Sequence, residues 1–330
     1  MTRPWPPGAV TSIGSLPGTD PVEAARLVFG ELPDLPHLAE LPGRGPGADM
    51  IGRAGALLID LPVEIVPSGW RLAAHDGRDV RAARDLLAWD LDAFEAAGEG
   101  YTGALKLQAA GPWTIAASVE LPSGHKIISD TGATRDLAAS LAEGLRLHLA
   151  EVARRLPAAR LVLQLDEPSL PAVLAGRVPT ASGFGTIRAV EAVTAEQALR
   201  DVLAVADTGS RVVHCCAADV PLRLLRDAGA DALSVDAARL HSAQNDDLGE
   251  AIDAGVSLWL GVLPSTDATV DLDTARGAVT RLWSELGFAA AEAAAAIVPT
   301  PACGLAGASP GYVRRVLSLL RDTGQSMLDA

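Results

Sequence analysis

The feature of this sequence that most constrains its fold is a regular alternation of short apolar runs with longer amphipathic segments. Eight runs rich in β-forming residues are each followed by a segment in which apolar residues recur every three or four positions. The connections between these units are too short for a domain boundary. Eight β/α units in 330 residues are typical of a (β/α)8 TIM barrel, so we expect residues 1–330 to form a single α/β domain.

The expected strands cover residues 9–13, 57–63, 104–109, 161–165, 211–216, 232–235, 256–262 and 295–298. Among the helices, the one near residues 135–156 has the clearest apolar stripe, formed by leucines at positions 137, 141, 145 and 149. A doubly wound open sheet is the alternative architecture. It normally contains fewer units, and no Gly-x-Gly-x-x-Gly fingerprint follows the first strand of this chain.

The charge and cysteine content exclude several kinds of partner and compartment. The chain has 41 acidic and 27 basic residues, a net charge of -14, which opposes binding to nucleic acid or to an anionic membrane and favours a small-molecule substrate. No apolar run reaches the roughly 18 residues of a membrane span, and residues 1–7 lack a secretory signal pattern, so we expect a cytoplasmic protein. A reducing compartment would keep the three cysteines as thiols, the form that binds metals.

The run Val212-Val213-His214-Cys215-Cys216 places an imidazole and a thiol two positions apart at the end of an apolar strand. Because successive side chains of a strand point to opposite faces, His214 and Cys216 face the same way and Cys215 faces the core. One nitrogen and one sulfur on the same face supply half of a zinc site. The other ligands must come from elsewhere in the chain.

Polar side chains with metal-binding or acid–base chemistry recur at the ends of the expected strands. They are Ser15, Glu64, Asp166, Glu167, His214, Cys216, Asp236 and Cys303. In a TIM barrel the carboxyl ends of all strands meet on one face, so these side chains are expected to converge there. His214, Cys216 and Cys303 would then give one nitrogen and two sulfur ligands, with the Asp236 carboxylate as the fourth.

Each of these residues also has an ordinary structural interpretation. Cys303 precedes a glycine, where a small buried residue would serve equally well. The Asp166-Glu167-Pro168 sequence is also typical of a helix N-cap or a solvated turn, and Asp236 could cap the helix that follows it. Of the remaining histidines, we expect His148 to pack near the leucine stripe of its helix and the others to lie on the surface or in loops.

Five segments resemble, in the same order, the signature segments of the cobalamin-independent methionine synthase catalytic domain. They are residues 12–17 (Ser-Ile-Gly-Ser-Leu-Pro), 164–168 (Gln-Leu-Asp-Glu-Pro), 214–216 (His-Cys-Cys), 231–236 and 301–305 (Pro-Ala-Cys-Gly-Leu). The His-x-Cys pair and the distant Cys-Gly are the specific parts, whereas Asp-Glu-Pro alone is a weak signal. The resemblance spans nearly the whole chain.

The resemblance implies a zinc-dependent TIM barrel that transfers a methyl group to the thiol of homocysteine to form methionine. Carried over to this chain, the zinc ligands are His214, Cys216, Asp236 and Cys303. The substrate carboxylate is expected near Ile13 and Ser15, and the substrate amino group against Asp166 and Glu64. The adjacent carboxylates Asp166 and Glu167 are the candidate catalytic pair.

Three departures from the family pattern concern zinc binding and the methyl donor. Asp236 stands where the family has glutamate, 330 residues are too few for the additional N-terminal barrel of the complete enzymes, and residues 261–267 contain no histidine after the seventh strand. The donor is therefore either methyltetrahydrofolate or a methylcorrinoid protein. Transfer to a different thiol, a tetrapyrrole decarboxylation, which fits an acidic site poorly, and a non-catalytic zinc-binding homologue are the alternative functions.

Overall fold

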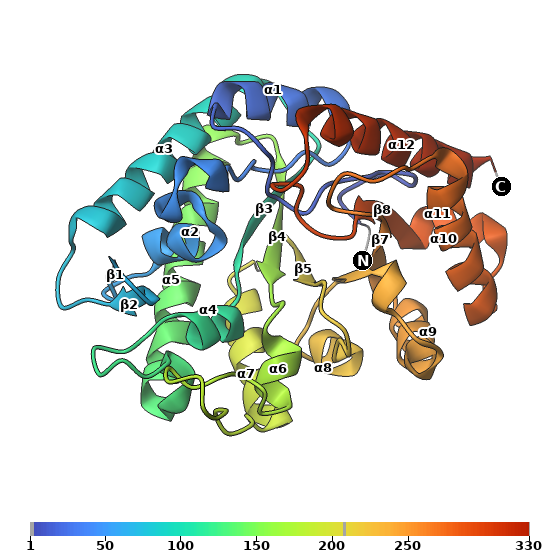
Figure 1. Cartoon of the computed structure of the whole chain (residues 1–330). Helices are drawn as coiled ribbons and strands as arrows, with labels where there is room; N and C mark the ends of the chain where they lie inside the picture. Colours follow the sequence, from blue (N-terminus) through green and yellow to red (C-terminus); the bar gives the residue numbers. More distant parts are fainter. Residues whose placement is uncertain (1–2, 207–208, 330) are drawn as a thin grey trace.

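The computed structural model describes residues 3–206 and 209–329, so Met1 and Thr2 of the N-terminal segment lie outside the described residues. At its centre is a six-stranded parallel sheet whose strands follow each other in chain order (Figure 1). The strands are β3 (Ala104–Ala110), β4 (Arg160–Asp166), β5 (Ser210–Cys215), β6 (Ala232–Asp236), β7 (Ser257–Leu263) and β8 (Ile297–Pro301). The α/β class and the last six predicted strands are confirmed.

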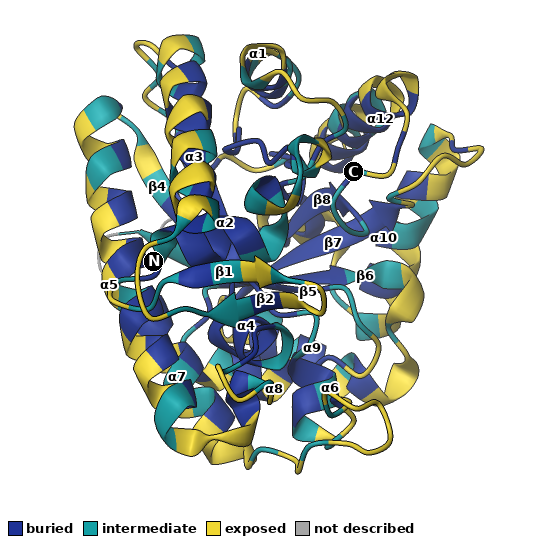
Figure 2. Cartoon of the chain, turned by 60° about the vertical axis from the view of Figure 1, so that its left-hand side comes forward, coloured by how far each residue is buried: buried dark blue, intermediate teal, exposed yellow. Residues whose placement is uncertain are grey.

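Helices connect and surround these strands (Figure 1). They are α1 (Pro21–Glu31), α2 (Met50–Leu57), α3 (Arg78–Ala97), α4 (Pro112–Ser118), α5 (Thr131–Arg155), α6 (Leu170–Leu174), α7 (Ala192–Leu203), α8 (Leu222–Asp227), α9 (Asn245–Asp253), α10 (Leu272–Leu286), α11 (Ala293–Ala296) and α12 (Pro310–Leu328). The long helices turn a buried side inward and an exposed side outward (Figure 2). None of the helices in the described ranges is long and apolar enough to cross a membrane.

The two faces of the sheet carry different side chains. One face packs against the helices through leucine and valine side chains of the main apolar cluster, including Leu105, Leu163 and Val213. The other face carries a separate apolar layer near the start of the strands, formed by Trp5, Ala9, Leu35, Ala104, Val162, Val212, Ala232, Trp259 and Val298. Two residues further along each of three neighbouring strands, this face becomes polar, with Lys106, Gln164 and His214.

The edges of the sheet, β3 and β8, are bridged by two extended segments that contain no named strand. Residues 9–16 lie beside β8, where Thr11 N–H donates to the Pro299 carbonyl at 3.4 Å. Residues 36–40 lie beside β3, and His37 forms a parallel bridge with Lys106. The segments also pair with each other, because Ser15 and Glu40 form a second parallel bridge. The structure therefore has six regular parallel strands and two irregular extended segments, of which only residues 9–16 coincide with a predicted strand.

The prediction of a strand at residues 57–63 is wrong. Residues up to Leu57 belong to α2, whose N-terminus is capped by Asp49 through the Gly52 N–H at 2.6 Å. Val63 then begins β1 (Val63–Val66), which pairs antiparallel with β2 (Gly69–Leu72) in a separate two-stranded sheet. The apolar run was ambiguous because a buried helix end and a buried strand have the same composition over a few residues.

The close approach of α5 to the end of α2 gives a test of the packing. A Cβ at Gly144 would lie 1.8 Å from the Leu57 carbonyl oxygen, so Gly144→Ala is expected to lower the free energy of unfolding by about 1–3 kcal/mol. Gly277 in α10 is the matched control, because its Cβ would meet open space and alanine there should be neutral or stabilising by up to about 1 kcal/mol. Urea denaturation of both variants measures the difference, and equal stabilities would contradict the packing described.

Candidate metal centre and active site

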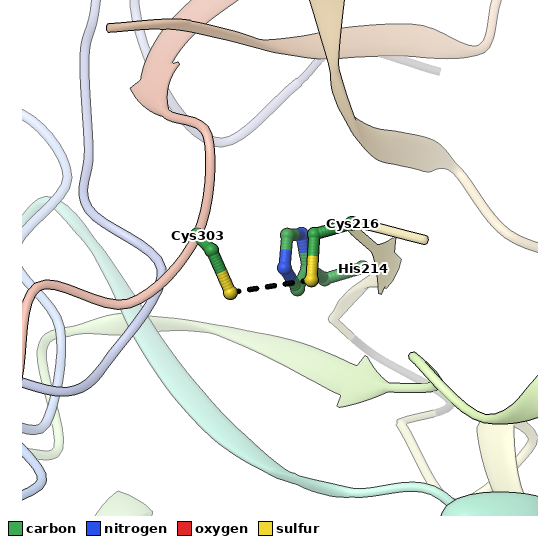
Figure 3. Close-up of side chains that lie close together, drawn as sticks. All are labelled: His214, Cys216 and Cys303. Atoms are coloured by element: carbon green, nitrogen blue, oxygen red, sulfur yellow. Dashed lines mark hydrogen bonds between the residues drawn. The ribbon is translucent and has the colours of Figure 1, made fainter. Parts of the chain in front are cut away.

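His214, Cys216 and Cys303 bring one ligand atom each to within 4.8 Å of one another. His214 lies on β5, Cys216 follows that strand directly, and Cys303 lies just beyond the end of β8. Figure 3 shows the two sulfur atoms directed toward each other, with the imidazole beside Cys216. The two separated sequence segments are thus brought together by the parallel sheet.

The imidazole of His214 is oriented by the neighbouring strand. His214 is opposite Ser234 of β6 in the strand register, and its Nδ1 lies 2.9 Å from the Ser234 hydroxyl. Its Nε2 is buried and has no hydrogen-bond partner among the described residues. A buried nitrogen without a partner is costly, so this atom is suited to a ligand that the protein itself does not provide.

The two cysteine sulfurs are within hydrogen-bond distance of each other. The Sγ atoms of Cys216 and Cys303 lie 3.2 Å apart. The hydrogen bond from Cys216 is the main reason that the pKa of Cys303 is lowered, and the same contact raises the pKa of Cys216. A thiolate facing a buried imidazole is the form in which cysteine ligates a metal. Two sulfurs and one nitrogen with a partnerless Nε2 fit a zinc ion.

Asp236 and Cys215 lie near these residues but outside the three-residue group. The Asp236 carboxylate accepts the Ala238 N–H at 2.9 Å and lies 3.4 Å from the Arg239 guanidinium. It thereby caps the short 3-10 helix η4 (Ala237–Arg239), and its role as a fourth ligand stays a prediction. Cys215 is fully buried in the main apolar cluster, on the face opposite His214.

Asp166 lies at the end of β4, opposite His214 in the strand register. It is 6% exposed and accepts a hydrogen bond from Gln164 Nε2 at 2.7 Å. Burial raises its pKa, the charge of His214 opposes this rise, and the negative charge of Glu40 adds to it. A cationic group of a substrate would therefore stabilise the ionised form of this carboxylate.

Glu167 has a different environment from its neighbour. Its carboxylate accepts three hydrogen bonds at the N-terminus of α4, from the Trp113 N–H, the Thr114 N–H and the Thr114 hydroxyl, at 2.7–2.9 Å. Gly111 is required beside it, because a Cβ there would lie 2.3 Å from Glu167 Oε1. Burial raises the pKa of Glu167 to about 7, against these hydrogen bonds. The structure thus gives this residue a helix-capping contact, and its catalytic role stays a prediction.

The predicted carboxylate-binding segment lies beside the metal-ligand candidates. Cys303 is followed by Gly304, and a Cβ on Gly304 would lie 2.1 Å from the Ser15 hydroxyl oxygen. The Ser15 carbonyl accepts the Leu305 N–H at 2.8 Å. The Ile13 carbonyl accepts hydrogen bonds from Lys106 and from Gln164, the latter at 2.9 Å. Residues 13–15 are therefore fixed between the polar layer of the sheet and Cys303.

Glu64 is placed on the separate hairpin. It belongs to β1, and its carboxylate pairs with the Arg71 guanidinium of β2 at 2.6 Å. More than a third of each of these two side chains is exposed. The structure shows this glutamate in a surface ion pair and not in the parallel sheet that carries Asp166.

Three buried polar residues near Asp166 were not predicted as site residues from the sequence: Lys106, Gln164 and Glu40. Lys106 donates to the side-chain oxygen of Gln164 at 2.9 Å, and burial lowers the pKa of Lys106 against the attraction of Asp166 and Glu40. The alternation of polar and apolar residues in the third strand was a signal for an inward-facing lysine. Glu40 lies in the extended segment 36–40, for which the sequence offers no strand pattern of usable length.

A cavity of about 570 Å³ opens beside this region, between the ends of β6 and β7 and helix α10. Its wall includes Asp236, Ala302 and Arg281. His214, Cys216 and Cys303 do not line this cavity, but Ala302 in its wall is the chain neighbour of Cys303.

An α/β fold with candidate site residues at the strand ends is typical of enzymes that build their sites at the carboxyl edge of a parallel sheet. The model of the family described as cobalamin-independent synthase, catalytic domain, matches residues 9–326. The chain therefore belongs to the cobalamin-independent methionine synthase catalytic-domain family, as the resemblance predicted.

One solved structure supports the fold. A B12-independent methionine synthase from Shewanella sp. W3-18-1, in complex with selenomethionine, superposes with a TM-score of 0.65 at 12% identity, covering 98% of both chains. Two further structures are too distant to support an argument. An Oleispira antarctica phosphodiesterase has a TM-score of 0.33 at 11% identity, covering 90% of this chain and 96% of that chain. A Cellvibrio japonicus xylanase has a TM-score of 0.36 at 9% identity, covering 75% of this chain and 56% of that chain. A comparison with curated protein sequences gives no match.

The metal content of cysteine variants tests the candidate centre. Protein purified without chelator is expected to contain about one zinc ion per chain, and Cys216→Ala and Cys303→Ala to lose most of it, because each removes a thiolate ligand. Cys215→Ala is the matched control, since this sulfur lies in the apolar core. Elemental analysis after gel filtration gives the number of zinc ions per chain. Asp236→Ala decides the fourth ligand, and unchanged zinc in Cys303→Ala would exclude the site.

Proposed function

We propose that this protein is a zinc-dependent methyltransferase that moves a methyl group to the thiol of homocysteine and forms methionine. The observation that carries the proposal is the grouping of His214, Cys216 and Cys303 within 4.8 Å beside the buried carboxylate of Asp166. Membership of the methionine synthase family and the selenomethionine bound to the Shewanella enzyme support an amino-acid thiol as acceptor.

The metal would be held by His214, Cys216 and Cys303, with Asp236 as the proposed fourth ligand. Zinc in such a site supplies Lewis acidity that favours the thiolate form of the substrate, the nucleophilic form at neutral pH. For Asp236 to take part, its carboxylate must give up its contact with Arg239, which lies 3.4 Å away. The shorter side chain, compared with the glutamate of the family, makes this the weakest of the four contacts.

The acceptor amino group would be recognised by Asp166 together with Glu40. Both carboxylates are buried, and Glu40 pairs in backbone register with Ser15, the residue proposed for the substrate carboxylate. An ammonium group that donates charge-assisted hydrogen bonds to two carboxylates is held more firmly than one that donates to a single carboxylate. We prefer Glu40 over the sequence-based candidate Glu64, because Glu64 is engaged with Arg71 at the surface.

Asp166 and Glu167 would have different roles, substrate binding and positioning respectively. Asp166 faces the polar layer that contains His214, so it is suited to hold the substrate ammonium and to exchange a proton with it. Glu167 anchors α4 against the end of β4 and thereby fixes the direction in which Asp166 points. We interpret the six strands and the two extended segments as one (β/α)8 barrel that forms a single domain around this site.

The donor would approach from the open side of the site. The cavity beside Asp236 and Ala302 is lined by residues 261–266, the region where the family histidine is missing, and it would hold the donor. Methyltetrahydrofolate and a methylcorrinoid protein both remain candidates, and the expected location is the cytoplasm, where the three free thiols would stay reduced. Transfer to another thiol and zinc binding without catalysis are the alternatives.

The donor experiment tests the proposal directly. Zinc-loaded protein with homocysteine is offered methyltetrahydrofolate, its triglutamate form or methylcobalamin in turn, and methionine is measured by mass spectrometry. We expect methionine from one of these donors, and loss of that product in Cys303→Ala. Formation of a different methylated thiol, when other thiols are offered, would identify the first alternative. Binding of zinc with no product from any donor and thiol would favour the non-catalytic homologue.

Two matched glutamate variants test acceptor recognition. Glu40→Gln is expected to raise the KM for homocysteine about tenfold or more, because it removes a charged partner of the ammonium group. Glu64→Gln is expected to change KM less than about twofold, since exposed ion pairs contribute little. Steady-state kinetics on both variants decide between the two residues. The reverse result would restore Glu64 as the substrate ligand.

A further inference from the structure

Arg53 is a buried cation that the proposed mechanism does not use. It lies in the middle of α2, where its side chain is 6% exposed among small residues such as Ala54 and Ala56. A Cβ at Gly52 would collide with the Pro46 carbonyl at 2.1 Å, and one at Gly55 with Val63 at 2.5 Å. The helix is therefore packed too closely for Arg53 to leave its position easily.

The guanidinium of Arg53 belongs to a chain of four buried charges. Arg53 Nη1 donates to Asp90 of α3, whose carboxylate is also held by Arg44 at 2.7 Å. On its other side, Arg53 Nε lies 3.5 Å from Glu40 Oε1. The four side chains are 2–9% exposed, and their formal charges sum to zero. Burying them is tolerated because each charge has an opposite neighbour.

The contact between Arg53 and Glu40 differs from the others in this group. At 3.5 Å it is an ion pair and not a short hydrogen bond, and no side-chain hydrogen bond reaches the Glu40 carboxylate from the described residues. Arg53 thus attracts Glu40 without saturating its oxygen atoms. Arg53 also pairs with Asp90 of α3, so Glu40, Arg53 and Asp90 form a continuous row of alternating charges.

We propose that Arg53, held by Asp90, is a positioning residue that directs the Glu40 carboxylate toward the ammonium group of the acceptor and so makes the site selective for amino thiols. This inference rests on the proposed function. Glu40 keeps free acceptor positions for an N–H donor, while its charge is balanced by its ion pair with Arg53 and by its attraction to Lys106. An acceptor thiol that lacks the amino group would have no N–H donor for the Glu40 carboxylate and would not bind more tightly because of it.

The test compares two thiols that differ only in the amino group, homocysteine and 4-mercaptobutanoic acid. The ratio of their kcat/KM values measures the selectivity. We expect Arg53→Met to lower this ratio about tenfold, mainly through the KM for homocysteine, with zinc content unchanged. Arg53→Lys should restore part of it, and Asp90→Asn, which touches neither Glu40 nor substrate, should lower it in the same direction.

Two further variants separate positioning from general stability. Arg155→Met is the control, because Arg155 is also paired with several acids but lies at the far end of α5. It should leave the ratio unchanged. In the Glu40→Gln background, Arg53→Met should have no additional effect on the ratio, since both act on the same carboxylate. Equal losses for both thiols in Arg53→Met and Arg53→Lys, or additive effects in the double variant, would overturn the inference.

Calorimetric titration of the two thiols into zinc-loaded protein measures the selectivity as the ratio of their two affinities, without any methyl donor. If wild-type protein forms no methylated thiol but binds homocysteine selectively, and Arg53→Met abolishes the selectivity, the positioning role holds although the proposed reaction fails. If methionine is formed but both thiols respond equally to Arg53→Met, the reaction holds and the positioning role is excluded.

Discussion

The side-chain amide of Gln164 joins three parts of the chain on which the candidate site depends. Its oxygen accepts from Lys106 of β3, while its nitrogen donates to the Ile13 carbonyl and to Asp166 at the end of its own strand. The irregular segment 9–16 is thereby tied to the middle of the sheet at a buried position. Because a buried amide and ammonium must both be satisfied, displacing any one of these groups leaves another unpaired.

That network explains how one face of the parallel sheet changes from apolar to polar along the strands. The inward face begins with an apolar layer around Val162 and Val212 and becomes polar two residues later, at Gln164 and His214. The period of two along each strand keeps these side chains on one face, and the parallel register aligns them across strands. The same geometry places Cys216 at the end of β5 and excludes Cys215, its neighbour in sequence. A one-residue slip of β5 would exchange the two thiols.

The parts of the site that follow from strand periodicity could be predicted from the sequence, and the parts that depend on distant pairing could not. The grouping of His214 and Cys216 is a local consequence of alternation, and Cys303 joins them because parallel strands end at one edge. Glu40 was missed because its segment is short, lies between Pro36 and Pro42, and takes its extended form from pairing with Gly14 and Lys106. The strand at residues 57–63 was wrongly predicted because this run has a strand-like composition, whereas Asp49 caps a helix that extends to Leu57.

Asp166 and Glu167 show how neighbouring carboxylates acquire different uses. Glu167 receives two backbone N–H groups and a hydroxyl at a helix N-terminus, an arrangement that fully satisfies a carboxylate and leaves little for a substrate. Asp166 receives one hydrogen bond from an amide that is shared with two other groups, and the negative charge of Glu40 adds to the rise that burial causes in its pKa. Under the proposed function, the ammonium group of the substrate would supply the donors that Asp166 and Glu40 do not receive from the protein. Arg53, paired with Asp90, would hold Glu40 in place for this contact.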